Sequence, residues 1–505
     1  MARLSEHDGK RLLAQHGMAV PRGLVARSAA EAERAAATLG CPVVVKIQAW
    51  TTGRAALGGV AFASSPAEAA THARRMLELT VGQFPVESVL IEEKIDIARE
   101  LFVSLAVDDR DRAPVLLFSP VGGSGVEERA ASTSRIRCNV GTGPDEAALT
   151  AAARTAEGVA APQIVAALRA VFDVAKASEA RSVEINPLTV TRDGRIVAAD
   201  CRVTIDDYAV FRHPELGIEI AREFDHPPTA LERVAYAVEQ ADHRGTFYFA
   251  QLATAAPAGS RGLIGFHGAG GGGSMMAMDA ITAEGFTVAD FTDTSGNPSS
   301  AKVYRAARII LSQPGLVGYF GSGSGVASQE QFWSAYGLAK AFWELQLDIP
   351  AVVRLGGNTE DRAVEILTSA SRDLSSTVEG YRKTDAPAFI ARRFAELVTA
   401  ANGRTWKPRG RRVPAYVGAA SSLSMPIKGA TVWIDAACWN DARAIVIANS
   451  SGLVRDGDGR PAFTLPAAEL AGKDSEFIAC EVECRRAGIG ALFVDLQVPN
   501  LAEAH

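Results

Sequence analysis

Short apolar runs alternate strictly with helical segments after Pro228, and this alternation restricts the folds open to the chain. Strands joined by helices form right-handed βαβ units, which assemble into a parallel sheet with helices on both faces. Residues 229–402 are therefore predicted to form a doubly wound α/β domain. Its strands are expected at 262–267, 286–291, 316–320 and 350–355, and its helices over 229–241, from about 273, over 299–312, over 328–345 and from 359.

Ligands of such a sheet bind outside the carboxyl ends of its strands. Glycine-rich or polar segments stand at those ends here, at 267–273, 293–298, 321–325 and 356–358. The first glycine run, with Asp290 and Asp293 further along, also resembles a dinucleotide fingerprint. That pattern is weak by itself and leaves the front of the chain unexplained, so a dehydrogenase is a poor interpretation.

Residues 1–228 have a different texture, in which antiparallel strands mix with helices, the pattern of an α+β domain. Ser5 followed by Asp8 predicts a capped helix that ends near Gly17, and Gly40 ends a second helix. The helices are expected to about 16, over 29–39, 66–79, 146–156 and 163–177, and the strands over 42–46, 89–93, 100–107, 113–118 and 182–190.

A hairpin in this front domain carries a candidate metal site. Glu184 and Asn186 lie two apart on one strand and so face the same way. The turn at 192–194 contains Asp-Gly, and the returning run 195–199 brings Asp200 back beside them. Two carboxylates and an amide oxygen suit a magnesium ion that also holds phosphate. An ordinary hairpin with a polar face is the alternative.

A second candidate site follows the strand that ends at Lys46. The loop after it contains Gly53 and Arg54, and a cation beside a loop of small residues suits phosphate binding. The alternative is a surface lysine, the commoner fate of a single lysine. Glu92 and Glu100, taken alone, would be a solvated charge cluster.

Composition excludes several classes of protein. The chain of 505 residues has a net charge of −6, which argues against nucleic acid and acidic membranes as partners. Its length fits two to four domains. No apolar stretch is long enough to span a membrane, the six scattered cysteines point to a reducing compartment, and the N-terminus lacks a signal core. The expected location is the cytoplasm.

Several stretches in one order resemble the β subunit of succinyl-CoA synthetase, a nucleoside-diphosphate-forming acid–CoA ligase. The resemblance covers residues 1 to about 400. It implies an ATP-grasp module over 1–228 and a flavodoxin-like domain over 229–402. The matching stretches are Pro42–Lys46, Thr52–Arg54, Gly58–Val60, Ile91–Glu92, Asp96–Glu100, Val183–Leu188, Asp200, His267–Gly270 and Val352–Asn358.

The resemblance also implies roles for single residues. Mg²⁺ would be bound by Asn186 and Asp200, and Glu184 would orient a phosphorylated histidine. That histidine would belong to a separate α-type subunit, which also binds most of the CoA. The helix that starts within 268–273 would turn its N-terminal N–H groups toward the phosphohistidine. ATP or GTP would be bound by Lys46, Gly53, Arg54, Glu92, Ile95 and Glu100, and a small carboxylic acid by His267, Gly321, Ser322 and Gly323.

Three departures from the family pattern concern nucleotide and acid. Residues 55–57 read Ala-Ala-Leu where the family has glycine and lysine, which restricts backbone approach to phosphate. His267 replaces the asparagine that contacts the substrate carboxylate, and the loop 321–326 is longer and lacks an arginine. These changes argue for a hydroxylated, bulkier or otherwise substituted acid instead of plain succinate.

Two further hypotheses concern single features. His267 either bonds its glycine loop or the substrate carboxylate, or is itself the phosphorylated residue; we favour the first. Residues 403–412 resemble a linker, and residues 413–505 lie outside the family match as a separate C-terminal segment of unknown role. Cys438, Cys480 and Cys484 there lack the spacing of a four-thiolate cluster, so no metal cluster is predicted.

The sequence as a whole indicates the β-type subunit of an acid–CoA ligase that forms ADP or GDP. In this hypothesis Mg-ATP phosphorylates the partner's histidine, and acyl phosphate and then acyl-CoA follow. The alternative is a catalytically weakened ATP-grasp homologue that senses nucleotide or acts as a scaffold. The loop at 55–57 favours the alternative, whereas the intact set of Lys46, Glu184, Asn186 and Asp200 favours the enzyme.

Overall fold

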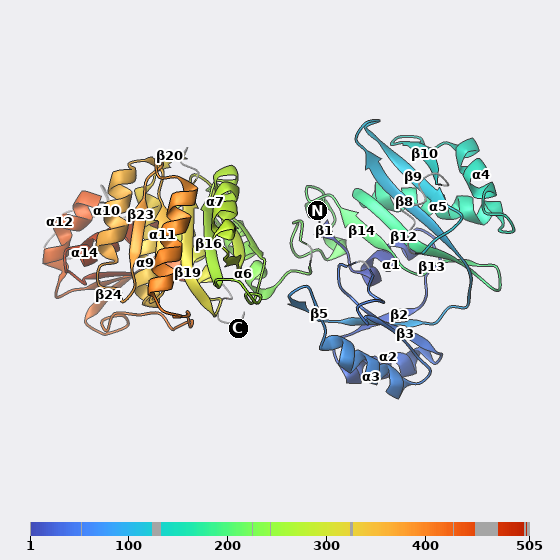
Figure 1. The fold of residues 1–505 in the computed structure, drawn as a ribbon, viewed down its shortest axis with the longest axis horizontal. Coiled ribbons are helices and arrows are strands. Elements are labelled where there is room, and N and C mark those ends of the chain that lie inside the picture. Colours follow the sequence, from blue (N-terminus) through green and yellow to red (C-terminus); the bar gives the residue numbers. More distant parts are fainter. Residues whose placement is uncertain are drawn as a thin grey trace. The chain divides into compact units, whose positions relative to one another are not determined.

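The computed structural model describes residues 2–501 apart from 52, 124–132, 225, 243, 324–326, 428, 450–472 and 499–500. The chain divides into two compact units, Met1–Pro228 and Thr229–His505 (Figure 1). Within the described residues, no helix has the length and apolar character needed to cross a membrane. The mixed α/β and α+β fold class predicted from the sequence is confirmed.

The front unit contains a large antiparallel sheet with the strand order β1-β14-β12-β8-β9-β10-β11, to which β13 is added beside β12. Helices α1, α4 and α5 supply apolar residues to the core that this sheet helps to form. The elements are β1 Ala2–Arg3, α1 Glu6–Gln15, β8 Ile97–Asp108, β9 Ala113–Ser119, β10 Ser134–Asn139, β11 Gly143–Pro144, α4 Glu146–Arg154, α5 Ala161–Ala177, β12 Ala180–Thr191, β13 Ile196–Ala198 and β14 Arg202–Ile205.

A smaller sheet, with the order β2-β7-β3-β4, has a separate core packed against α2 and α3 (Figure 1). The predicted helix over 29–39 is confirmed, because Ser28 caps its start and Gly40 ends it in the left-handed region at φ 66°. The elements are β2 Gly23–Ala26, α2 Ala29–Leu39, β3 Val43–Ile47, β4 Val60–Ala63, α3 Pro66–Leu77, β5 Thr80–Val81, β6 Phe84–Pro85 and β7 Val89–Glu93.

The second unit is built on a sheet with the order β15-β18-β16-β19-β21-β23. The strand pairs from β18 to β23 are parallel. When these five strands are numbered along the chain, they lie side by side in the order 2-1-3-4-5, as in flavodoxin-like folds. The edge strand β15 is antiparallel. The strands are β15 Tyr248–Gln251, β16 Leu263–Ala269, β17 Thr287–Val288, β18 Asp290–Asp293, β19 Leu316–Gly323, β20 Ala327–Glu330, β21 Ala351–Arg354, β22 Gly357–Asn358 and β23 Val378–Tyr381.

Helices cover both faces of this sheet. Helices α7 and α11 share one core with it, and α6, α8, α9 and α10 contribute to another. The helix predicted over 328–345 is wrong at its start, because 327–330 pairs as a strand with β22 and the helix begins at Phe332. The helices are α6 Ala230–Ala241, α7 Gly271–Ala283, α8 Ser300–Ile310, α9 Phe332–Leu345, α10 Glu360–Ala370 and α11 Pro387–Ala400.

The C-terminal segment shares the core of the second unit. Its strands β24 Ser422–Ile427, β25 Ala430–Asp435 and β26 Leu492–Leu496 form an antiparallel sheet. Helices α12 Trp439–Asn449 and α14 Asp474–Arg486 complete the segment, and its apolar residues join those of α8, α9 and α10 in one cluster. Cys480 and Cys484 belong to that cluster and are fully buried, so their side chains serve packing.

Candidate active site

A cavity of about 960 Å³ opens in the front unit, between residues of both of its sheets. Every residue predicted to bind nucleotide, bind metal or orient the phosphoryl group lies in its lining. These residues come from strands far apart in the sequence and from three loops. They are Lys46, Gly53, Arg54, Glu92, Ile95, Glu100, Glu184, Asn186 and Asp200.

The metal-site hairpin forms as the sequence predicts. Strand β12 carries Glu184 and Asn186, and β13 pairs with it so that Ala198 lies opposite Leu188. Ala199 then donates its N–H to Pro187 O at 3.2 Å, which brings Asp200 beside the start of the pair. The return is longer than predicted, because β14 continues along β12 with Arg202 opposite Glu184.

The three oxygen-bearing side chains of this hairpin suit a magnesium ion. Asp200 Oδ2 accepts from Arg54 at 2.9 Å, and Asn186 Oδ1 accepts from the N–H of Gly123 at 2.9 Å. Magnesium is commonly held by one or two carboxylates plus substrate phosphates and keeps several waters. Glu184, Asn186 and Asp200 together could therefore hold it, with phosphate oxygens and water completing the coordination.

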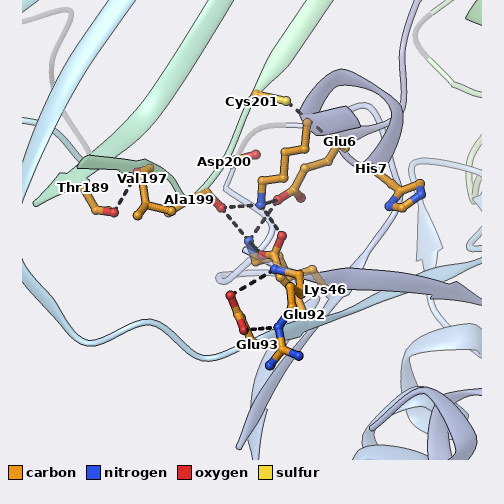
Figure 2. Close-up of polar contacts among 12 residues, drawn as sticks. Glu6, His7, Lys46, Glu92, Glu93, Thr189, Val197, Ala199, Asp200 and Cys201 are labelled. Atoms are coloured by element: carbon orange, nitrogen blue, oxygen red, sulfur yellow. Dashed lines mark hydrogen bonds and ion pairs between the residues drawn. The ribbon is translucent and has the colours of Figure 1, made fainter. Parts of the chain in front are cut away.

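Lys46 lies at the centre of a buried ionic network (Figure 2). Its ammonium group donates to Glu6 Oε1 at 2.9 Å, Glu92 Oε2 at 2.8 Å and Ala199 O at 2.8 Å. Burial alone would lower the pKa of Lys46, but the charges of Glu6, Glu92 and Asp200 raise it above its ordinary value. Lys46 is therefore charged at neutral pH and borders the cavity as a fixed cation.

Arg54 connects this network to the metal-site hairpin. One of its terminal nitrogens donates to Glu6 Oε2 at 2.6 Å and to Ile47 O at 3.1 Å, and the other donates to Asp200. Burial would lower its pKa, but Glu6 and Asp200 raise it. A fixed guanidinium beside the Asp200 carboxylate is suited to neutralising phosphate charge.

Sequence analysis missed Glu6 and Lys10, which α1 inserts behind Lys46. Lys10 donates to Glu6 Oε1 at 2.8 Å, Glu92 Oε1 at 2.6 Å and Ala199 O at 2.7 Å. Burial would raise the pKa of Glu6, but Lys46, Lys10 and Arg54 hold it well below its ordinary value. The only sequence signal was an i,i+4 pair of opposite charges, which is commonest on solvated helix faces.

Part of the cavity lining is apolar. A lining of this kind suits a flat nucleobase, because aromatic and branched side chains offer stacking surface without competing hydrogen bonds. Lys94, another residue of the lining, places its ammonium group over the Phe62 ring, 5.2 Å from the ring centre. Both oxygens of Glu92 are bound to lysines, so this carboxylate faces the cations. The apolar lining residues are Val44, Val60, Phe62, Ile97, Phe102 and Leu117.

The altered loop after Arg54 closes on itself. Ala56 donates its N–H to Gly53 O at 2.9 Å, and Gly59 donates to Arg54 O at 2.8 Å. Gly53 has a φ of 66°, in the left-handed region that favours glycine. The N–H groups of Ala56 and Gly59 are therefore used within the turn. Thr52, part of the resemblance, lies outside the described residues.

In the second unit, His267, Gly321, Ser322 and Gly323 come together around a small cavity at the carboxyl ends of β16 and β19. The Nδ1 atom of His267 is hydrogen-bonded to Tyr319 Oη. Its Nε2 atom is hydrogen-bonded to Thr294 Oγ1 at 3.0 Å. Within the described residues, the buried Ser322 hydroxyl has no hydrogen-bond partner. Residues 324–326 of the predicted substrate loop lie outside the described part.

Burial lowers the pKa of His267 to about 3. The ring is therefore neutral at physiological pH, and both nitrogens are engaged by hydroxyl groups. This geometry is unfavourable for the hypothesis that His267 is the phosphorylated residue, because a nitrogen nucleophile must face its phosphate donor. It fits the view of a histidine that holds the strand ends around the glycine loop.

The stability of the second unit should fall in acid because of this ring. The unfolded histidine binds a proton near pH 6.5, and the folded one only near pH 3. The contribution of His267 is therefore complete above pH 6.5 and is lost as the pH falls toward 3. In His267→Gln, the free energy of unfolding should depend less on pH between pH 6.5 and 4 than it does in the wild type.

The start of α7 is partly occupied by the protein itself. Asp293 Oδ1 accepts the N–H groups of Gly270 and Ser295, each at 2.8 Å. This carboxylate already meets the positive end of the helix. A phosphorylated side chain docking there would have to share that position with Asp293, so the role that the resemblance implies for this helix stays a prediction.

Comparison with known proteins agrees with this architecture. Residues 3–190 match the model of the ATP-grasp domain. The chain is 33% identical over 383 residues to "Succinate--CoA ligase [ADP-forming] subunit beta" of Rubrobacter xylanophilus, covering 74% of this chain and 95% of that one. It is also 33% identical to the GDP-forming β subunit of Thermus thermophilus, covering 72% and 93%.

The fold and cavity thus define an ATP-grasp protein. The extent of these matches goes further: the chain belongs to the succinate–CoA ligase β-subunit family. Among solved structures, ATP citrate lyase from Methanothrix soehngenii, in complex with citrate and coenzyme A, has a similar fold, with a TM-score of 0.61 at 18% identity. That match covers 78% of this chain and 99% of the other.

Proposed function

We propose that the chain is the β-type subunit of a carboxylic acid–CoA ligase that forms ADP or GDP. The carrying observation is that Lys46, Arg54, Glu184, Asn186 and Asp200 line one cavity, whose lining also includes apolar residues. That arrangement supports binding of a nucleoside triphosphate with its base in the apolar part and its phosphates at the cations. Family membership supports the same activity.

Phosphoryl transfer depends on positioning and charge neutralisation more than on covalent chemistry by the protein. In our proposal Lys46 and Arg54 bind the phosphates and balance their charge. Glu184, Asn186 and Asp200 hold and orient the end of the triphosphate through a magnesium ion, which when bound neutralises the transferring phosphoryl group. Glu184 additionally orients the acceptor nitrogen, and the Ile95 segment and Glu100 contact the nucleoside.

The acceptor is proposed to be a histidine of an α-type partner subunit that also binds CoA. The phosphohistidine would then give its phosphoryl group to the acid, and the thiol of CoA would displace phosphate from the acyl phosphate. A substituted acid is preferred to plain succinate. In support, the guanidinium of Arg354 lies near the glycine loop but donates to Gly323 O at 3.0 Å and to the backbone carbonyls of Arg382 and Lys383. These donors are therefore used within the protein and not for a second carboxylate of the acid.

Calorimetric titration with Mg-ATP tests the nucleotide part of this proposal. The wild-type chain is expected to bind, and Asp200→Ala should weaken binding by roughly tenfold or more, a loss of at least about 1.4 kcal/mol. Asp193→Ala, the same substitution at the exposed turn of the same hairpin, is the control and should bind normally. If the wild type and Asp200→Ala both fail to bind, the enzyme loses its support.

The reconstituted pair of subunits tests the rest. CoA-dependent release of ADP or GDP should appear with one class of carboxylic acid in a panel that contains succinate and its hydroxylated and bulkier analogues. Binding of nucleotide without turnover for any acid would favour the alternative, a nucleotide-sensing or scaffolding homologue. One observation favours this alternative: all three N–H donors of the Lys46 ammonium group already bond acceptors within the protein.

A further inference from the structure

Helix α1 places two charged residues, one turn apart, in the interior of the front unit. The side chains of Glu6 and Lys10 are each only 4% exposed. A charged side chain is rarely buried unless it is paired, because taking it out of water costs several kcal/mol. Both residues are paired here, and their partners are the residues proposed to meet the nucleotide's phosphates.

The two lysines share one set of acceptors. An ammonium group carries three N–H donors. Lys10 and Lys46 each donate to Glu6 Oε1, to a different oxygen of Glu92, and to Ala199 O. Ala199 precedes Asp200, so the same network holds the backbone next to the metal-site carboxylate (Figure 2).

The lysines differ in what they face. Lys46 and Arg54 line the nucleotide cavity, whereas Lys10 is absent from its lining and lies behind Lys46. Glu6 is also absent from this lining, but it borders a smaller cavity that shares Arg54, Glu184 and Asp200 with the first one. Its Oε2 accepts from Arg54 at 2.6 Å. Lys10 can therefore act on a nucleotide in this cavity only through its partners, and Glu6 acts on it through the bonds that it makes to Lys46 and Arg54.

The charges of the network balance. Lys10, Lys46 and Arg54 are positive, and Glu6, Glu92 and Asp200 are negative. Without Lys10, Lys46 would be the one ammonium group between two buried carboxylates, and it would be held more firmly away from an incoming phosphate. Lys10 thus relieves Lys46 of part of the negative charge that Glu6 and Glu92 impose.

We propose that Glu6 and Lys10 are positioning residues that hold Lys46 and Arg54 available to the phosphates of the bound nucleotide. This role rests on the nucleotide site of the proposed function. Lys10 sets the charge that Lys46 presents, and Glu6 sets the direction of both cations. The role is specific for phosphate, because neither residue lies at the apolar part of the cavity.

The test compares nucleotides that differ only in phosphate number. Dissociation constants for ATP, ADP, AMP and adenosine are measured by calorimetry on the full chain. Lys10→Met should weaken ATP binding about tenfold, the change that about 1.4 kcal/mol produces, and leave adenosine binding unchanged. The ratio of the ATP to the adenosine constant is the decisive readout, since general loosening of the fold would weaken both ligands.

Three further variants keep the test decisive. Lys10→Arg retains the charge and should restore most of the ATP-to-adenosine ratio. Should Lys10→Met fail to fold, Glu6→Gln replaces it: its amide keeps an acceptor but loses the charge that directs Arg54, and it should lower the ratio in the same way. Lys176→Met, an exposed lysine of α5 outside the cavity lining, should keep the wild-type ratio.

The outcomes separate this inference from the proposed function. If the wild type binds ATP and Lys10→Met, or Glu6→Gln in its place, keeps the wild-type ratio, the positioning role is overturned while the nucleotide site stands. A loss of equal size for ATP and adenosine also overturns it, because the effect is then structural. If the wild type binds none of the nucleotides, the proposed function itself fails.

Discussion

Replacing Lys46 by methionine should remove most of the ligase activity and also destabilise the front unit. The substitution takes one cation from a phosphate site, where loss of a single charged or donor group typically costs about 10²–10³ in rate. It also leaves Glu6 and Glu92, which are 4% and 2% exposed, with less positive charge around them. Breaking a buried ion pair from one side costs about 3–5 kcal/mol.

Two measurements check this expectation: turnover of the reconstituted pair, and urea unfolding of the chain followed by probes in the front unit. Lys94→Met is the matched control, because Lys94 borders the same cavity but is exposed and forms no part of the network. A Lys46→Met protein with near-normal turnover would contradict the phosphate role. Equal losses in both variants would show that any lysine at the cavity edge matters as much.

The sequence allowed a good prediction of the doubly wound unit because most of its strands and helices have a recognisable local sequence pattern. Apolar runs of strand length are bounded by glycine, and the helices follow with clear periodicity, so β16, β19, β21 and α8 fall close to where they were expected. The start of α9 failed because 327–330 bonds to β22, a contact that no local pattern reports.

The metal-site hairpin was predictable for a related reason. A tight Asp-Gly turn fixes the register of the two strands, and register decides which side chains meet. Glu184, Asn186 and Asp200 therefore reach one cavity as expected. The magnesium site followed from the spacing of these oxygen ligands, whereas the role of Glu184 toward a phosphohistidine came from the resemblance alone; the structure adds the bond between Arg54 and Asp200.

Glu6 and Lys10 could not be predicted, because their importance depends on what packs against α1. A Glu–Lys pair at i,i+4 is the usual decoration of an exposed helix face. Here the ends of β3 and β7 and the segment at Ala199 meet that face, and all of them are distant in sequence. Local pattern carries no information about such long-range packing.

The C-terminal segment shows the same limit at a larger scale. It was expected as a separate part after a linker, yet α14 packs on α8, α9 and α10 in the core of the second unit. The contact surface is not only apolar. Lys340 of α9 bonds Glu481 of α14 at 2.7 Å and pairs with Glu344 at 2.5 Å, and all three are almost fully buried.

Lys340→Met should therefore destabilise the second unit severely, by about 3–5 kcal/mol, because it leaves Glu344 and Glu481 in the core without their shared cation. The Lys340 ammonium also lies 4.6 Å from the centre of the Phe493 ring, a contact that methionine replaces only in part. Lys383→Met, an exposed lysine of the same unit, should change stability little. Chemical denaturation of both variants gives the comparison.

A second substitution separates charge from packing. In Lys340→Met/Glu481→Leu/Glu344→Leu the whole ion group becomes apolar, and replacement of a complete buried ion group is often neutral or stabilising. Stability should then return toward the wild-type value, less the loss from Tyr304 and Arg485, which bond Glu344 and Glu481 at 2.7 and 3.0 Å. If Lys340→Met alone is as stable as the wild type, the ion group does not contribute to holding α14 on α9. The shared apolar cluster must then hold the C-terminal segment alone.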